Sequence, residues 1–145
     1  MKLTKSLDIG LQILIQLAAQ KKQLSAADLA RILDAPRNHI AKVVQILTRG
    51  GYIRTLRGKG GGIRLARPVE QISLQEIVDI VEGPLYLMEC TINPGVCPFS
   101  APCRLRLKLR EAQEGMIKVF RTTRLNELLP GARRGSPNPP KDPTR

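Results

Sequence analysis

The strongest indication of the fold is a pair of short helical segments followed at once by a glycine-rich hairpin, all between residues 25 and 65. Ser25 and Asp28 have the spacing of a capping box that begins the first helix, and a turn at Asp34-Ala35-Pro36 ends it. A second helix is expected over about residues 37–48, because apolar residues recur there at helical intervals. Two β-rich runs then enclose glycines and basic residues, as in a hairpin. This succession predicts a winged helix-turn-helix in which the hairpin is the wing.

Further helices flank this unit. Thr4 is expected to cap a first helix that ends at Lys21-Lys22-Gln23, and Ser73 with Glu76 begins another that stops at Gly83-Pro84. A long helix over about residues 103–122 carries a narrow apolar seam suited to a partner helix, formed by Leu105, Leu109, Ala112, Met116 and Val119. The predicted fold class is therefore mainly α: a winged helix-turn-helix with a small β-hairpin wing, plus a long C-terminal dimerisation helix.

Three regions follow from these boundaries. Residues 1–83 are predicted to form the DNA-binding domain, residues 84–129 the cysteine loop and dimerisation helix, and residues 130–145 a disordered tail rich in Pro, Gly and Arg. No apolar run approaches the roughly 18 residues that cross a bilayer, and the first residues lead into an amphipathic segment. We therefore expect a cytoplasmic protein without a membrane partner.

Basic charge is concentrated in the first half of the chain. Residues 1–68 hold 13 basic and 3 acidic groups, or +10 of the formal net charge of +12. This excess predicts a polyanionic partner, and a merely solubilising basic face is the alternative. The predicted DNA contacts lie at the start of the second helix of the pair and at the hairpin tip: Arg37, Asn38, His39, Lys42, Arg57 and Lys59. For His39, the only histidine, a sugar–phosphate contact or a packing role are equally consistent with the sequence.

The three cysteines of the chain lie close together, and Cys90, Cys97 and Cys103 are separated by six and five residues. An odd number of thiols in a cytoplasmic protein disfavours a disulfide framework. Zinc sites usually contain a Cys-x-x-Cys pair, which is absent here, whereas longer spacings suit an iron–sulfur cluster. Zinc and metal-free thiols remain the alternatives. A fourth ligand must come from a carboxylate or a small molecule, since the chain has no fourth cysteine.

Other function classes find less support. An enzyme, for instance a small redox protein, is disfavoured because the sequence has no nucleotide-binding loop and no histidine–carboxylate pair. An architectural DNA-binding protein with zinc would share the basic first half, and metal analysis would separate it from an iron–sulfur regulator.

Together these motifs resemble a known family. Lys2-Leu3-Thr4 with Asp8, the hairpin Arg57-Gly58-Lys59-Gly60-Gly61-Gly62 and the cysteine trio are similar to the Rrf-type iron–sulfur transcriptional regulators over about residues 1–129. The resemblance implies a homodimer paired through the long helices, a palindromic DNA operator and a cluster between that helix and the DNA-binding domain.

The resemblance also implies a ligand set. In the nitric-oxide-sensing branch, three cysteines and a helix-1 aspartate of the partner subunit hold a 4Fe-4S cluster, and Asp8 stands at the matching position. In the iron-responsive branch a histidine after the third cysteine completes a 2Fe-2S site, but here that region reads Leu107-Lys108-Leu109. This favours a 4Fe-4S repressor that senses nitric oxide, with an iron- or redox-responsive 2Fe-2S regulator as the alternative. From the sequence alone, the helix dipole is the better explanation of Asp8, and it is the resemblance that favours ligation.

Overall fold

The computed structural model describes residues 3–97 and 103–131 of the chain. Its N-terminal part contains three helices and a hairpin, namely α1 (Lys5–Gln20), α2 (Ala26–Ile32), α3 (Arg37–Arg49), β1 (Ile53–Leu56) and β2 (Gly62–Leu65). The 3₁₀ turn η1 (Val69–Gln71) leads to α4 (Leu74–Glu82). Two further turns, η2 (Glu89–Thr91) and η3 (Pro94–Val96), precede α5 (Arg104–Thr122) and a last turn η4 (Leu125–Leu128). The predicted tail beyond residue 131 lies outside the described residues.

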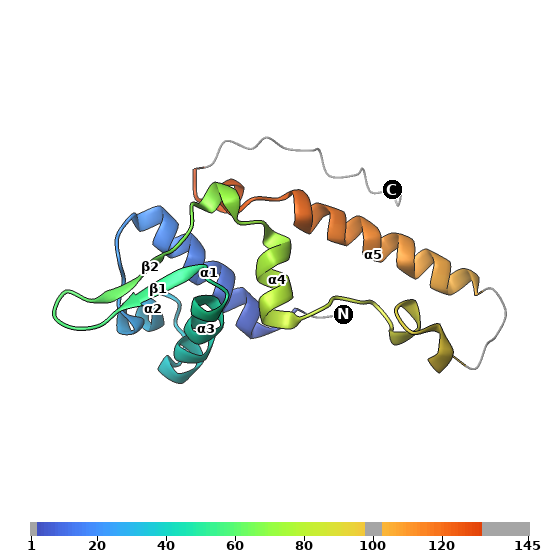
Figure 1. The fold of residues 1–145 in the computed structure, drawn as a ribbon, viewed down its shortest axis with the longest axis horizontal. Helices are drawn as coiled ribbons and strands as arrows, with labels where there is room; N and C mark the ends of the chain where they lie inside the picture. Colours follow the sequence, from blue (N-terminus) through green and yellow to red (C-terminus); the bar gives the residue numbers. More distant parts are fainter. Residues whose placement is uncertain (1–2, 98–102, 132–145) are drawn as a thin grey trace.

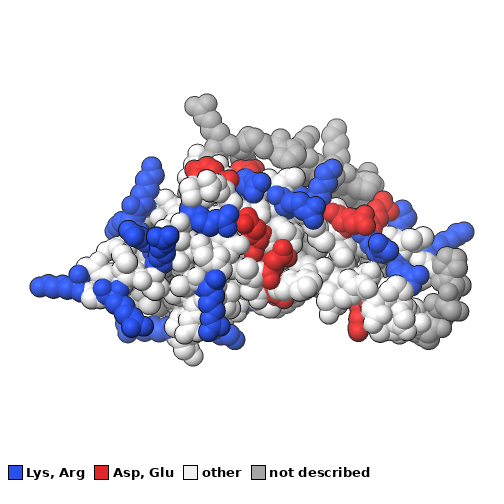
Figure 2. Space-filling view, viewed as in Figure 1, with Lys and Arg blue, Asp and Glu red and all other residues white. Residues whose placement is uncertain are grey.

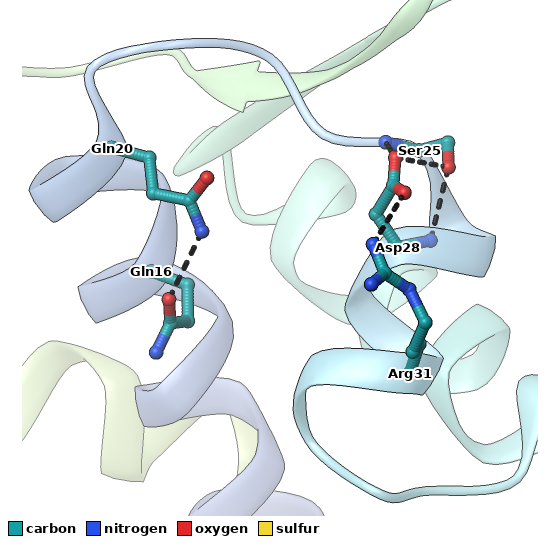
Figure 3. Close-up of polar contacts among 5 residues, drawn as sticks. All are labelled: Gln16, Gln20, Ser25, Asp28 and Arg31. Atoms are coloured by element: carbon teal, nitrogen blue, oxygen red, sulfur yellow. Dashed lines mark hydrogen bonds and ion pairs between the residues drawn. The ribbon is translucent and has the colours of Figure 1, made fainter.

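Helix starts follow the predicted caps. The Thr4 hydroxyl accepts from the Leu7 amide at 3.4 Å at the start of α1. At α2 the Ser25 hydroxyl accepts from the Asp28 amide at 3.0 Å, and the Asp28 carboxylate accepts from the Ser25 amide at 3.1 Å (Figure 3). Each bond satisfies an amide that the first helical turn leaves unpaired. Ser73 with Glu76 repeats the box at α4.

The connection between α1 and α2 is paired with the hairpin. In the last turns of α1, the side chain of Gln20 donates to Gln16 at 3.2 Å (Figure 3). Lys21 then takes a left-handed backbone with φ of 49°, which ends the helix. Leu24 forms a one-residue bridge with Ile63 of β2, with backbone bonds of 3.0 and 2.8 Å. The α1–α2 connection therefore lies beside the hairpin.

The hydrophobic core is built from aliphatic side chains around α1. Its buried members come from α1, α2, α3 and α4, from both strands and from η4. They include Leu7, Ile13, Leu14, Leu29, Ile40, Leu47, Ile53 and Ile77. The hairpin pairs Ile53 with Leu65 and Thr55 with Ile63, so that Arg54 and Arg64 oppose each other on the other face. One small departure from expectation occurs at an element end, because Cys103 is the N-cap of α5 and does not lie in the helix.

Helix α5 forms a long arm on one side of the molecule. Its end is held beside the start of α4 by backbone bonds from Leu74 to Thr123 and from Leu125 to Ile72, each 2.9 Å. Figure 1 shows the wing at one end of the molecule and the segment between α4 and α5 at the other. Within the described residues, no helix is both long enough and apolar enough to span a bilayer. The winged helix-turn-helix with a long C-terminal helix is confirmed.

Candidate nucleic-acid interface and cysteine site

The outward face of α3 carries the predicted DNA contacts. Arg37, Asn38 and Lys42 are exposed, while the opposite face of the helix is fully buried. His39 is half-buried, and its Nε2 lies 3.2 Å from the Ser6 hydroxyl of α1. The three exposed side chains therefore stand on a helix anchored from behind, in the arrangement that enters a major groove. His39 differs from them because its ring links α3 to α1.

The wing tip depends on its glycines. Gly58 has a φ of 96°, a conformation that side chains disfavour. A Cβ at Gly61 would lie 2.3 Å from the Leu56 carbonyl oxygen, so a larger residue would force the backbone to move. The basic side chains of Arg57 and Lys59 are exposed on this tight loop. The tip therefore presents two cations on a backbone thin enough to approach DNA closely.

A groove separates α3 from the wing. One hollow of about 270 Å³ lies between them and is lined by Val44, Gln45, Thr48, Arg49 and Thr55. Gln45 and Arg49 are exposed there, and they extend the row of exposed polar side chains on α3 two turns beyond Lys42. Figure 2 shows basic side chains gathered around the wing end of the molecule, with acidic ones nearer its middle. The wing end is therefore the face suited to a polyanion.

The cysteines occupy three separate turns of the chain. Cys90 lies in η2, Cys97 caps the end of η3, and Cys103 is the N-cap of α5. All three are half-buried free thiols. The described residues contain no group of three His, Cys, Asp or Glu gathered around one point, and residues 98–102 contain none of these types. Within the described residues, the three predicted thiols are therefore near one another in sequence but are not gathered around one point.

The chemistry of the donors fits an iron–sulfur cluster. Thiolates are the ligands that hold such clusters, and three cysteine side chains are available in this segment. Apolar side chains around the loop remain exposed, with 47% of Met88, 55% of Ile92 and 47% of Val96 accessible. These side chains offer the apolar surroundings that tune and shield a cluster.

One glutamine fastens the cysteine loop to α5. The Gln113 side-chain oxygen accepts from the Leu87 amide at 3.2 Å and from the Thr91 hydroxyl at 3.1 Å. Thr91 is buried next to Cys90, and its hydroxyl also donates to the Met88 carbonyl at 2.6 Å. Gln113 therefore sets the position of the turn that carries the first thiol.

Asp8 lies exposed on the first turns of α1. Its carboxylate pairs with Lys5 at 2.7 Å and accepts from Gln12 at 2.6 Å. The hydrogen bond from Lys5, followed by that from Gln12, holds the pKa of Asp8 below its usual value. Asp8 is thus ionised at neutral pH and sterically accessible, as an anionic ligand must be.

A second contact joins the start of α1 to the end of α4. The Glu82 carboxylate accepts from the Thr4 amide at 2.9 Å and from the Thr4 hydroxyl at 2.5 Å. Glu82 immediately precedes Gly83, where the segment leading to the cysteines begins. The N-terminus of α1 and the root of the cysteine loop are therefore held together.

These features agree with the comparison of the chain with protein families. Residues 3–131 match the Rrf2 family model, described as an iron-dependent transcriptional regulator. The chain belongs to the Rrf2 family. This Rrf2 chain is similar to the transcriptional regulator NsrR of Geobacillus kaustophilus, with 35% identity over 132 residues, covering 89% of this chain and 90% of that protein. NsrR of Bacillus subtilis is 36% identical over 132 residues, with the same coverage.

Solved structures of other proteins show the same fold. The global cysteine regulator CymR of B. subtilis superposes with a TM-score of 0.74 at 24% identity, over 88% of this chain and 95% of that one. IscR of T. potens superposes with a TM-score of 0.71 at 18% identity, over 88% and 85% of the two chains. The Rrf2 chain described here is thus a winged-helix transcriptional regulator similar to NsrR.

Several residues of this Rrf2 site were not predicted from the sequence. Long-range hydrogen bonds are formed by the side chains of Gln113, Glu82 and Gln23, with partners 22 to 78 positions away. No local sequence pattern predicts such pairs. Arg54 and Arg64 had a usable signal, because alternation along two short strands places them on one face.

Proposed function

We propose that this Rrf2 regulator is an NsrR-like repressor whose affinity for a palindromic operator is controlled by an iron–sulfur cluster that reacts with nitric oxide. The observation that carries the proposal is the loop with three half-buried free thiols, in a chain that is 35–36% identical to NsrR over 132 residues. The predicted DNA contacts on α3 and the wing supply the operator-binding surface.

The proposed ligands are the thiolates of Cys90, Cys97 and Cys103, with Asp8 of the partner subunit as the fourth. When bound, the cluster supplies iron atoms that react with nitric oxide. The 4Fe-4S form is favoured because residues 107–109 contain no histidine to complete a 2Fe-2S site. The low pKa of Asp8 supports its role, because a carboxylate must be ionised to bind iron.

The proposed control acts over a distance. The wing and the segment between α4 and α5 lie at opposite ends of the molecule (Figure 1), so the thiols do not influence the wing by contact. The root of the cysteine loop is instead tied to α1 through Glu82 and Thr4, and α1 packs against α3. Ligation by Asp8 across the dimer would then set the separation of the two α3 helices, which must be about 34 Å to reach successive major grooves.

The surface proposed for dimerisation is the apolar seam of α5. Leu105 and Val119 are 62% and 58% exposed, at opposite ends of the helix, and Leu109 and Met116 between them are half-buried. Residues separated alternately by four and three positions form one stripe that pairs with an equivalent helix. A homodimer built on this seam supports the presence of two half-sites in one operator.

The proposal is tested on protein purified without oxygen. We expect iron and sulfide in the protein, a visible absorbance band that changes with nitric oxide, and weaker operator binding after that change. An Asp8→Ala variant should lose iron faster or show an altered spectrum. Gln12→Ala is the matched control, because it removes a hydrogen bond to Asp8 but keeps the carboxylate.

Two results would overturn parts of this proposal. Iron-free protein that binds the operator as tightly as the iron-loaded form excludes control by the cluster. An Asp8→Ala spectrum identical to that of the wild type, with the same response to nitric oxide, excludes Asp8 as the fourth ligand. A response to iron depletion with none to nitric oxide would favour the iron-responsive alternative.

A further inference from the structure

The hairpin has a second basic face, away from α3. Lys21 and Lys22 from the α1–α2 connection lie beside Arg54 and Arg64 of the hairpin, and all four are exposed. We call these four residues the outer basic surface. Lys21, Lys22 and Arg64 line one hollow of about 410 Å³, together with Leu17, Gln23 and Leu65. None of the four belongs to the predicted contacts of α3 and the wing tip.

The outer basic surface is attached to the wing by hydrogen bonds. The Gln23 side-chain amide donates to the Gly60 carbonyl in the wing loop. Next to it, the backbone of Leu24 is paired with Ile63 through two bonds of 3.0 and 2.8 Å. The connection that carries the two lysines is therefore attached to the hairpin at its tip and along its edge, so the lysines keep a defined position relative to the arginines.

The charges of this surface are not neutralised within the described part of the chain. Arg54 and Arg64 face each other across the two strands, an arrangement of like charges that destabilises a hairpin. None of the four residues forms a salt bridge among the described residues, whose ion pairs lie on α1, on α2, between Arg67 and Glu76, and on α5. A lysine at the end of α1 can be explained by the helix dipole, but the paired arginines cannot. The surface is thus built for an anion supplied from outside.

The position of this surface relative to α3 indicates which anion. A hairpin tip that enters the minor groove has one sugar–phosphate strand along each of its faces, because the groove is only about 6 Å wide. The face toward α3 would then meet the strand that separates this minor groove from the major groove entered by α3. The opposite face, with Arg54 and Arg64, meets the other strand and the DNA beyond it.

We propose that the outer basic surface binds the phosphates of duplex DNA flanking the operator, on the far side of the minor groove entered by the wing. This inference rests on the proposed DNA-binding role of the wing and extends the contact outward from it. The expected contribution is independent of base sequence, because phosphate contacts carry no sequence information directly.

The test compares two duplexes that carry an operator selected by the protein itself from randomised DNA. The short duplex ends at the edge of the wing contact, and the long one extends about one helical turn, about 10 base pairs, further on each side. The variant is the triple substitution Lys21→Gln, Lys22→Gln and Arg64→Gln. The matched control replaces three exposed cations of α5, Arg110, Lys118 and Arg121, by Gln. Thermal unfolding checks that both variants are folded.

The expected size follows from counterion release. Each lost phosphate contact reduces the slope of log affinity against log salt by about 0.9, so three lost contacts reduce it by about 2.7 per protomer. Between about 50 and 200 mM salt, the wild type should lose about 40-fold more affinity per protomer than the variant on the long duplex. On the short duplex the variant and the wild type should have the same slope, and the α5 control should behave as wild type on both.

Equal slopes for the wild type and the triple variant on the long duplex would overturn the inference. So would an equal change on both duplexes, because the cations would then act on the operator itself. Failure of the wild type to prefer the operator over random DNA would instead contradict the proposed function, and the short duplex shows this without the flanks.

Discussion

The position of the cysteine loop is expected to depend on Gln113, and Gln113→Leu tests this directly. The substitution keeps a branched side chain of similar bulk, one atom shorter, but removes the oxygen that accepts from the Leu87 amide and the Thr91 hydroxyl. A hydrogen bond contributes about 1 kcal/mol net, so losing both costs about 2 kcal/mol of local stability. Each 1.4 kcal/mol is a factor of ten, so opening of this loop should become about 30-fold more frequent.

Amide hydrogen exchange of Leu87, measured by NMR on the metal-free protein, reports this opening. The Leu87 amide should exchange about 30-fold faster in Gln113→Leu than in the wild type, while core amides of α1 and α3 keep their rates. Gln113→Glu is the matched variant, because a carboxylate oxygen can accept both bonds and should restore most of the protection.

If Leu87 exchanges within about twofold of the wild-type rate in Gln113→Leu, the loop is not held by this side chain and the reasoning fails. If core amides also exchange faster, the substitution has destabilised the whole protein. In the iron-loaded protein, the same variant should transfer its iron to a chelator faster, provided the proposed thiolate ligation is correct.

Three further outcomes follow from the geometry. Gly61→Ala should weaken operator binding in a mobility-shift assay with little loss of helix content by circular dichroism, since its Cβ would lie 2.3 Å from the Leu56 carbonyl oxygen. Ser73→Ala removes the cap of α4 and should lower the free energy of unfolding in urea by about 1 kcal/mol. Burial opposes the ionisation of Glu76, but hydrogen bonds from Ser73 and then Arg67 hold its pKa below the usual value of 4.5. Its contribution is therefore complete above about pH 4.5 and is lost in acid, so the wild type should lose more stability than Glu76→Gln on acidification. An equal loss in both proteins would contradict this sign.

Several of these features were predictable because they depend on residues close in sequence. The caps at Thr4, Ser25 and Ser73 were predictable because the hydroxyl and the amide it accepts from are three positions apart. The same holds for the buried stripe of α3 and for the glycine hairpin, which follow helical and strand periodicity. Local pattern also accounts for the exposure of five of the six residues predicted to contact DNA, while the half-buried position of His39 beside Ser6 was not revealed by it.

Local sequence patterns alone were sufficient to predict a winged helix, an exposed basic face on its third helix and a loop with three cysteines. Helices, caps and turns are specified by residues a few positions apart. The contacts that connect these parts were visible only after folding. Glu82 contacts Thr4, Gln23 contacts Gly60, and Gln113 contacts Thr91, because packing brings together residues 22 to 78 positions apart. Sequence periodicity does not predict such contacts, since they depend on how the helices and the hairpin pack around α1.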